Sequence, residues 1–204
     1  MAPFTTGNSA AKKLLLVVMG VSGSGKTTVG LALAADLGVP FRDADDLHPV
    51  ANVAKMAAGI ALTDEDRMPW LGLVGAELAV APDGLVIACS ALKQAYRRVI
   101  LAAAPTVGFV FLDGSRELLE SRVRFRRGHF MPVSLLDSQL ATLEPLTLEE
   151  PGVRMSLDEH PTVASIVSSI VALLTVVPSV EVPLVEAPLV QHSPVTSPLL
   201  RAPE

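Results

Sequence analysis

Cysteine, histidine and excess basic charge are all scarce in this chain of 204 residues. Its single cysteine, Cys89, excludes an internal disulfide framework and indicates the reducing environment of the cytoplasm. The four histidines lack the spacing that is typical of a transition-metal site. A net charge of −5 provides no basic field for a nucleic acid, and the apolar runs are too short to cross a bilayer. We therefore expect a cytoplasmic protein that binds neither nucleic acids nor membranes.

Hydrophobic residues make up half of the chain, and alanine, valine and leucine dominate them. This composition suits an α/β core whose strands are buried on both faces. Runs of strand type alternate with helical patterns, which predicts a parallel sheet covered by helices on both faces. The expected strands are 14–19, 39–43, 85–89, 107–112 and 153–157, and the expected helices are 27–37, 51–58, 64–80, 92–103, 116–127, 135–143 and 163–174.

These elements predict one domain, residues 13–174, with a different kind of segment at each end. Residues 1–12 have the composition of a flexible leader. Residues 175–204 contain six prolines, a density that forbids a helix or a central strand. We expect this Pro- and Val-rich tail to be extended or disordered.

Residues 20–28 form a complete phosphate-binding loop of the pattern G-x-x-x-x-G-K-[ST], between an expected strand and an expected helix. The glycines allow the backbone to curl so that successive N–H groups point at phosphate oxygens of ATP. Lys26 can reach the β- and γ-phosphates, and the hydroxyl of Thr27 can bind Mg²⁺. The expected ATP-binding residues in this loop are Gly20, Ser22, Gly23, Ser24, Gly25, Lys26, Thr27 and Thr28.

Two carboxylates, Asp43 and Asp45, follow the second expected strand. In open α/β sheets ligands bind beyond the carboxyl ends of the strands, so both side chains are candidates for the site. One could hold Mg²⁺, partly through water, or take a proton from an attacking hydroxyl, while the other binds substrate hydroxyls. The alternative is that both are turn residues that cap a loop.

Residues 63–67 combine a helix start with a candidate anion-binding arginine. Thr63 and Asp66 have the spacing of a capping box, and acidic residues are typical of a first helical turn. Proline and tryptophan at 69 and 70 are expected to open the helix body. Arg67 could grip a substrate carboxylate through two parallel hydrogen bonds, or could pair with a neighbouring aspartate.

Arg122 and Arg126 lie four residues apart on one expected helix and therefore share a face. Like charges at that spacing repel, so a triphosphate could compensate them; the alternative is a solvated basic face. The sequence Gly128-His129-Phe130 then provides a flexible stop of the kind that a closing lid requires.

Together these residues resemble the small P-loop gluconate kinases, the thermoresistant type of gluconokinase. The resemblance covers about residues 14–170, and its most specific strings are Asp46-Leu47-His48-Pro49, Asp66-Arg67-Met68-Pro69-Trp70-Leu71 and Cys89-Ser90-Ala91-Leu92-Lys93. It implies a P-loop kinase fold related to shikimate and adenylate kinases, with a five-stranded parallel sheet of order 2-3-1-4-5 and a small lid. It also implies ATP, Mg²⁺, D-gluconate as acceptor, and a homodimer.

The same resemblance assigns roles by position. Asp43 is implied as the catalytic carboxylate beside Lys26, and Arg122 and Arg126 as lid residues that face the nucleotide. The residues implied on the acceptor side are Asp45, His48, Lys55, Arg67, Lys93 and His129. The chain departs from the family pattern at Arg98, where an acidic residue is usual, and at Leu140-Ala141, where the family has Phe-Glu.

The predicted activity is therefore the phosphorylation of D-gluconate to 6-phospho-D-gluconate. Two alternatives stay open on the residues alone. One is a kinase of this fold for another small hydroxy acid, such as shikimate. The other is a regulatory module that binds ATP and transfers nothing, although Asp43, Asp45 and Arg67 would be needless for that.

Overall fold

The computed structural model describes residues 13–125 and 133–176. Five strands form one parallel sheet in the order β2-β3-β1-β4-β5, which confirms the order that the resemblance implied. The strands are β1 (Leu14–Met19), β2 (Phe41–Asp43), β3 (Gly84–Ala88), β4 (Gly108–Asp113) and β5 (Gly152–Ser156). The expected leader and nearly all of the expected tail lie outside the described residues.

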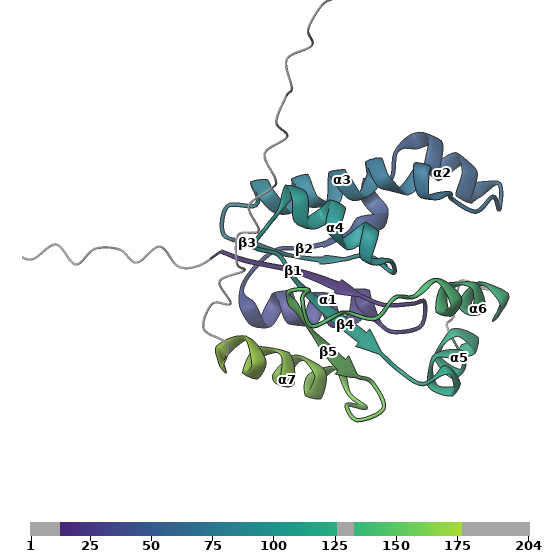
Figure 1. Cartoon of the computed structure of the whole chain (residues 1–204). Coiled ribbons are helices and arrows are strands. Elements are labelled where there is room, and N and C mark those ends of the chain that lie inside the picture. Colours follow the sequence, from purple (N-terminus) through teal and green to yellow (C-terminus); the bar gives the residue numbers. More distant parts are fainter. Residues whose placement is uncertain (1–12, 126–132, 177–204) are drawn as a thin grey trace, which may run out of the picture.

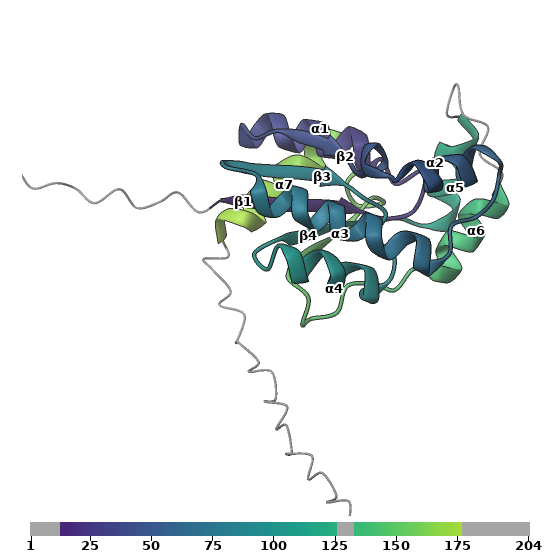
Figure 2. The ribbon, with the colours of Figure 1, turned by 90° about the horizontal axis from the view of Figure 1, so that it is seen from above.

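Helices cover both faces of the sheet, as the alternating pattern predicted (Figure 1). On one face lie α1 (Lys26–Leu37) and α7 (Val163–Val176), and on the other lie α3 (Asp64–Val80) and α4 (Gln94–Ala103). Three further helices gather at the end of the molecule where β1 ends, in both views (Figure 2). They are α2 (Val50–Ala57), α5 (Arg116–Phe125) and α6 (Val133–Thr142).

The central strand β1 is buried on both faces, which explains its unbroken apolar sequence. Because side chains alternate along a strand, Val17 packs with the core under α3 and α4, whereas Val18 packs with the core under α1 and α7. Leu71 and Ile100 belong to the first core, and Ile170 to the second. The two cores hold the carboxyl end of β1, and so the loop that follows it, in a fixed place.

Helix α3 begins at Asp64, directly after the predicted capping residue. Pro69, which was expected to open the helix body, instead lies inside the helix. The predicted capping box explains this start: the Thr63 hydroxyl accepts from the N–H of Asp66 at 3.3 Å. In return, the Asp66 carboxylate accepts from the N–H of Thr63 at 3.0 Å. Two N–H groups that the helix cannot satisfy internally are thereby paired.

Replacing Thr63 by alanine should lower the free energy of unfolding by about 1 kcal/mol, because the first turn of α3 loses its cap. For a chain of this size that corresponds to a melting temperature about 2–4 °C lower. Thermal unfolding followed by circular dichroism measures it, with Thr63→Ser as the variant that keeps the hydroxyl. Equal melting temperatures for the alanine variant and the wild type would show that the cap contributes nothing.

Candidate active site

The phosphate-loop sequence follows β1 and runs into α1, as predicted. Gly20 has a φ of 142°, and a Cβ at this position would lie 2.7 Å from the carbonyl oxygen of Leu112 on β4. Gly23 has a φ of 83°, and a Cβ there would meet the side chain of Val123 on α5 at 2.9 Å. Only glycine allows this curl and this close approach.

Helix α1 has no side chain that caps its first turn, because its N-cap is Gly25. Its uncapped N–H groups and the positive end of its dipole therefore remain available to an anion. Lys26, the first residue of the helix, donates from Nζ to the carbonyl oxygen of Val21 at 3.1 Å. The loop, the helix start and the lysine together fit the phosphates of ATP.

Thr27 and Asp43 join the loop to the end of β2. The Thr27 hydroxyl donates to Oδ2 of Asp43 at 3.0 Å. A hydroxyl and a carboxylate side by side form an oxygen donor set, which is the kind that Mg²⁺ takes at phosphate-transfer sites. The residues predicted for Mg²⁺ therefore lie together and fit the ion in their chemistry.

Asp43 also caps the short 3₁₀ helix Ala44–Leu47, since its Oδ1 accepts from the N–H of Asp45 at 3.2 Å. The turn-capping interpretation is thus correct for one oxygen of Asp43, while the other oxygen faces Thr27. Asp45 keeps 85% of its side chain exposed. Partial desolvation and repulsion from Asp43 raise the pKa of Asp45.

His48 lies under the acceptor side of the site. Only 4% of its side chain is exposed, and its ring stacks on Trp70 at 4.0 Å between centroids. Burial lowers the pKa of His48, although the Asp45 carboxylate, 3.9 Å away, opposes the shift. A neutral imidazole at neutral pH follows, one that can exchange hydrogen bonds with a hydroxyl without adding charge.

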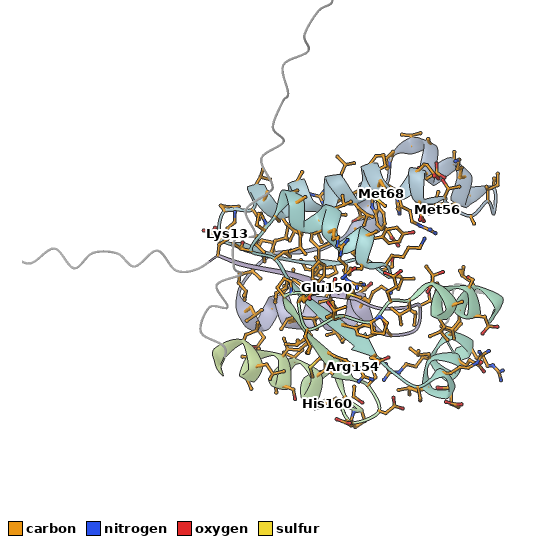
Figure 3. The ribbon with its side chains drawn as sticks, in the orientation of Figure 1. Lys13, Met56, Met68, Glu150, Arg154 and His160 are labelled. Carbon is orange, nitrogen blue, oxygen red and sulfur yellow. The ribbon has the colours of Figure 1, made fainter. Side chains whose placement is uncertain are left out.

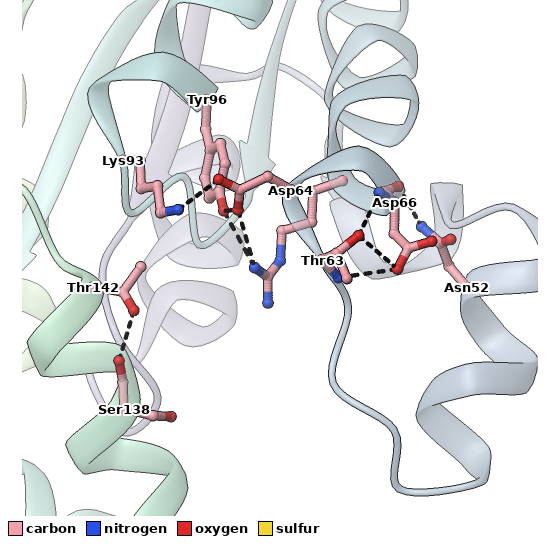
Figure 4. Close-up of polar contacts among 9 residues, drawn as sticks. Asn52, Thr63, Asp64, Asp66, Lys93, Tyr96, Ser138 and Thr142 are labelled. Carbon is pink, nitrogen blue, oxygen red and sulfur yellow. Dashed lines mark hydrogen bonds and ion pairs between the residues drawn. The ribbon is translucent and has the colours of Figure 1, made fainter.

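Asp64, at the start of α3, organises a group of cationic and hydroxyl side chains (Figure 4). Lys93 Nζ donates to it at 2.6 Å, the Tyr96 hydroxyl also donates to it, and Arg67 lies 3.8 Å away. The hydrogen bonds from Lys93 and Tyr96 lower the pKa of Asp64. The acidic residue that the sequence analysis assigned to the helix start therefore also holds two predicted acceptor-side residues in place.

The remaining acceptor-side residues have separate partners. Lys55 donates to both carboxylate oxygens of Asp66, at 2.6 and 2.7 Å, and this contact lowers the pKa of Asp66. Arg67 pairs with Asp64 at 3.8 Å, which confirms the alternative of a neighbouring aspartate, and its Nη1 donates to the Tyr96 hydroxyl at 3.2 Å. Within the described part of the chain, the hydrogen bond and the ion pair of the Arg67 side chain both use Nη1, so the other edge of its planar fork can receive a ligand.

The predicted lid is described only in part. Arg126 and His129 lie outside the described residues, so the shared face of Arg122 and Arg126 is not tested. Arg122 is half-buried on α5. Its charge helps to lower the pKa of Asp158, after the larger effect of hydrogen bonds from Ser115.

Sequence reasoning missed the functional neighbourhood of Tyr96 and the ion pair beside it. The sequence analysis assigned no role to Tyr96 or Arg97. Arg97 is fully buried, and its guanidinium holds both oxygens of Glu150 at 2.5 and 2.9 Å. Burial alone would raise the pKa of Glu150, but hydrogen bonds from Arg97 and Thr147 lower it on balance. The side chain of Glu150, labelled in Figure 3, is only 6% exposed, and this ion pair supports the start of α4.

The departures from the family pattern lie on α4 and α6. Arg98 is exposed on α4, next in the chain to buried Arg97. Leu140 packs against the core under α1 and α7, and Ala141 is exposed.

No helix in residues 13–125 and 133–176 is long and apolar enough to cross a membrane. Over the same residues, no three His, Cys, Asp or Glu side chains cluster as metal ligands.

Comparisons with known proteins place the chain among small-molecule kinases. The sequence profile of the shikimate kinase family matches residues 22–151. Gluconokinase from Gluconobacter oxydans is 50% identical over 155 residues, covering 74% of this chain and 87% of the relative. Thermoresistant gluconokinase from Escherichia coli is 39% identical over 159 residues, covering 76% of this chain and 91% of the relative.

Solved structures of kinases are also similar to this chain. A gluconokinase from Sinorhizobium meliloti matches with a TM-score of 0.72 at 45% identity, covering 80% of this chain and 93% of that one. Shikimate kinase from Bacteroides thetaiotaomicron matches with a TM-score of 0.58 at 19% identity, which shows likeness of fold alone.

Proposed function

The chain belongs to the gluconokinase family of P-loop kinases, and from this premise we propose how its residues transfer the γ-phosphoryl group of ATP to D-gluconate. The product is 6-phospho-D-gluconate. One observation carries the assignment of roles: the phosphate loop and the acidic turn after β2 meet through the Thr27–Asp43 hydrogen bond of 3.0 Å. A nucleotide phosphate and an acceptor hydroxyl would therefore lie on either side of Asp43.

On the nucleotide side, the loop N–H groups and the start of α1 bind the phosphates, and Lys26 balances charge that develops during transfer. Thr27 and Asp43 would hold Mg²⁺, directly or through water. When bound, the ion neutralises charge on the β- and γ-phosphates. Asp43 also orients the attacking hydroxyl and accepts its proton, because it is the carboxylate that touches the loop. Arg122 and Arg126 are proposed to face the nucleotide.

On the acceptor side, a polyhydroxy acid needs acceptors for its hydroxyls and a cation for its carboxylate. Asp45 and neutral His48 provide hydroxyl partners, and Arg67 provides the planar fork for the carboxylate. Lys55 and Lys93 lie at the edges of this group, where each is held by an aspartate of α3. His129 completes the proposed set.

A panel of acceptors tests this proposal against the alternative kinase of the same fold. Purified protein with ATP and MgCl₂ is given D-gluconate, shikimate, D-galactonate or D-glucose, and phosphorylated products are identified by mass spectrometry. We expect turnover with gluconate at a kcat/KM at least about tenfold above the others. Glucose lacks the carboxylate, and shikimate and galactonate arrange their hydroxyl groups differently from gluconate. Preference for shikimate or for glucose would overturn the acceptor assignment.

Arg67→Lys should raise the KM for gluconate about tenfold or more while the KM for ATP stays nearly unchanged. Lysine keeps the positive charge but loses the planar fork that matches a carboxylate. Initial-rate kinetics with each substrate varied in turn gives both constants. Equal changes in the two, or no change, would show that Arg67 acts only as a structural partner of Tyr96 and Asp64.

The proposal further includes a homodimer in the cytoplasm. The family resemblance supports the homodimer. The single cysteine, which is buried, supports the cytoplasm. Burial raises the pKa of the Cys89 thiol to about 12, so this residue is unreactive. Light scattering coupled to gel filtration measures the molecular mass, and a mass near 21.4 kDa would exclude the dimer.

A further inference from the structure

The phosphate loop is held by a side chain that lies 117 positions further along the chain. The backbone N–H of Ser22 donates a hydrogen bond of 2.7 Å to the side-chain amide oxygen of Gln139 on α6. The contact is partly buried. A carbonyl oxygen therefore already occupies one N–H group of the loop that is predicted to cradle phosphates.

The position of Gln139 is set by the packing of its own helix, α6, against the core. Leu136, three residues earlier on α6, is fully buried, and Leu140 and Leu143 pack against the core. These contacts fix the rotation of α6, and so they fix the direction of Gln139 toward the loop. Ser138 lies on the same helix but is exposed, and its hydroxyl donates to the carbonyl oxygen of Leu135 within that helix.

The chain beyond α6 is attached to α4. The Glu144 N–H donates to the carbonyl oxygen of Leu92 at 2.9 Å, and its carboxylate accepts from the N–H of Gln94 at 2.6 Å. Gln94 is the first residue of α4, whose N-cap residue supplies no side-chain cap. Glu144 therefore caps α4, and buried Arg97 strengthens the junction by donating to the Glu144 carbonyl at 2.9 Å.

Helix α4 in turn carries Tyr96 and follows directly on Lys93, the two residues that hold Asp64 on the acceptor side. Figure 4 shows this group across from Ser138 and Thr142 of α6. Two hydrogen bonds joined by short stretches of chain thus connect the loop to the acceptor side. Ser22 bonds to Gln139, the chain runs from Gln139 to Glu144, and Glu144 accepts from Gln94, which follows Lys93 directly.

Resting on the proposed function, we propose that Gln139 is a positioning residue that holds the phosphate loop ready for nucleotide and links it, through Glu144 and α4, to the gluconate side. ATP and gluconate should then bind with mutual dependence, each tightening the other by the same factor. A coupling claim of this kind needs a direct measurement of coupling.

Three single variants test the Ser22–Gln139 contact and the Glu144 cap separately. Gln139→Met keeps the length and packing of the side chain but removes the acceptor for Ser22. Glu144→Ala leaves Gln139 in place but removes the cap of α4. Ser138→Ala is the matched control on the same helix. Calorimetry measures binding of the β,γ-imido analogue of ATP with MgCl₂, and then of gluconate with and without a saturating amount of the analogue.

Gln139→Met should weaken binding of the analogue about 2- to 10-fold, the effect of one hydrogen bond, and should reduce the tightening of gluconate by the analogue. Glu144→Ala should leave binding of the analogue unchanged yet reduce the same tightening. Ser138→Ala should match the wild type in both. Unchanged or tighter binding of the analogue to Gln139→Met would overturn the positioning role, and full coupling in Glu144→Ala would overturn the link.

Hydrogen exchange of the nucleotide-free protein supplies a second readout that does not depend on ligands. The Ser22 amide should exchange faster in Gln139→Met than in Ser138→Ala, and equal rates would contradict the inference. Failure of the proposed function is distinguishable, because it would appear as absence of gluconate binding and turnover in the wild type itself.

Discussion

Lys26→Ala should lower kcat about 10²- to 10³-fold while the protein stays folded. The lysine is a point charge next to the transferring phosphoryl group, and losing one such preorganised group costs about that much in rate. The fold should survive because Lys26 is the half-buried first residue of α1, with a described contact to the loop carbonyl of Val21. Initial rates of ADP release measure the loss.

The matched control is Lys13→Ala, which removes a lysine whose described partner is the carbonyl oxygen of Ala79, away from the loop (Figure 3). It should keep the wild-type rate. Near-normal turnover in folded Lys26→Ala would contradict the assignment of residues 20–28 as the phosphate-binding loop.

Asp43→Asn should lower kcat about 10²-fold or more with only a small change in the KM for gluconate. The amide can still accept from the N–H of Asp45 and so still cap the 3₁₀ helix, but it can neither take a proton nor carry charge to the metal. A loss confined to kcat is the sign of an interaction made chiefly in the transition state.

Asp45→Asn is the comparison for that experiment. Asp45 is exposed and is proposed to bind substrate hydroxyls, so its loss should raise the KM for gluconate and change kcat little. If instead Asp45→Asn lowers kcat and Asp43→Asn raises KM, the two carboxylates must exchange roles.

Local patterns predicted the parts of the site that lie close together in the sequence. The loop at residues 20–28, the capping box of Thr63 and Asp66, and the position of Asp43 just after a strand each depend on spacing within a few residues. The parallel sheet followed from alternating elements, whereas the order of its strands came from the resemblance to a family. The role of Pro69 was predicted less accurately: it lies inside α3 and does not open the helix body, because the capping box starts the helix upstream of it.

Contacts between distant elements could not be predicted in this way. Asp64 meets Lys93 and Tyr96 across about 30 positions, and Arg97 meets Glu150 across 53. Ser22 and Gln139 are further apart still. Such pairs depend on how α3, α4 and α6 pack around the sheet, and neither periodicity nor composition reports that packing. The acidic residues at the start of α3 were therefore correctly assigned to a helix start, but their hold on the acceptor-side lysines was not foreseen.

The proposed activity is tested most directly by a coupled assay of ADP release by the wild-type protein, with ATP and MgCl₂, in the presence and absence of D-gluconate. We expect ADP release that depends on gluconate, with an equal amount of 6-phospho-D-gluconate formed. ADP release that is the same with and without gluconate, or no release under either condition, would contradict it.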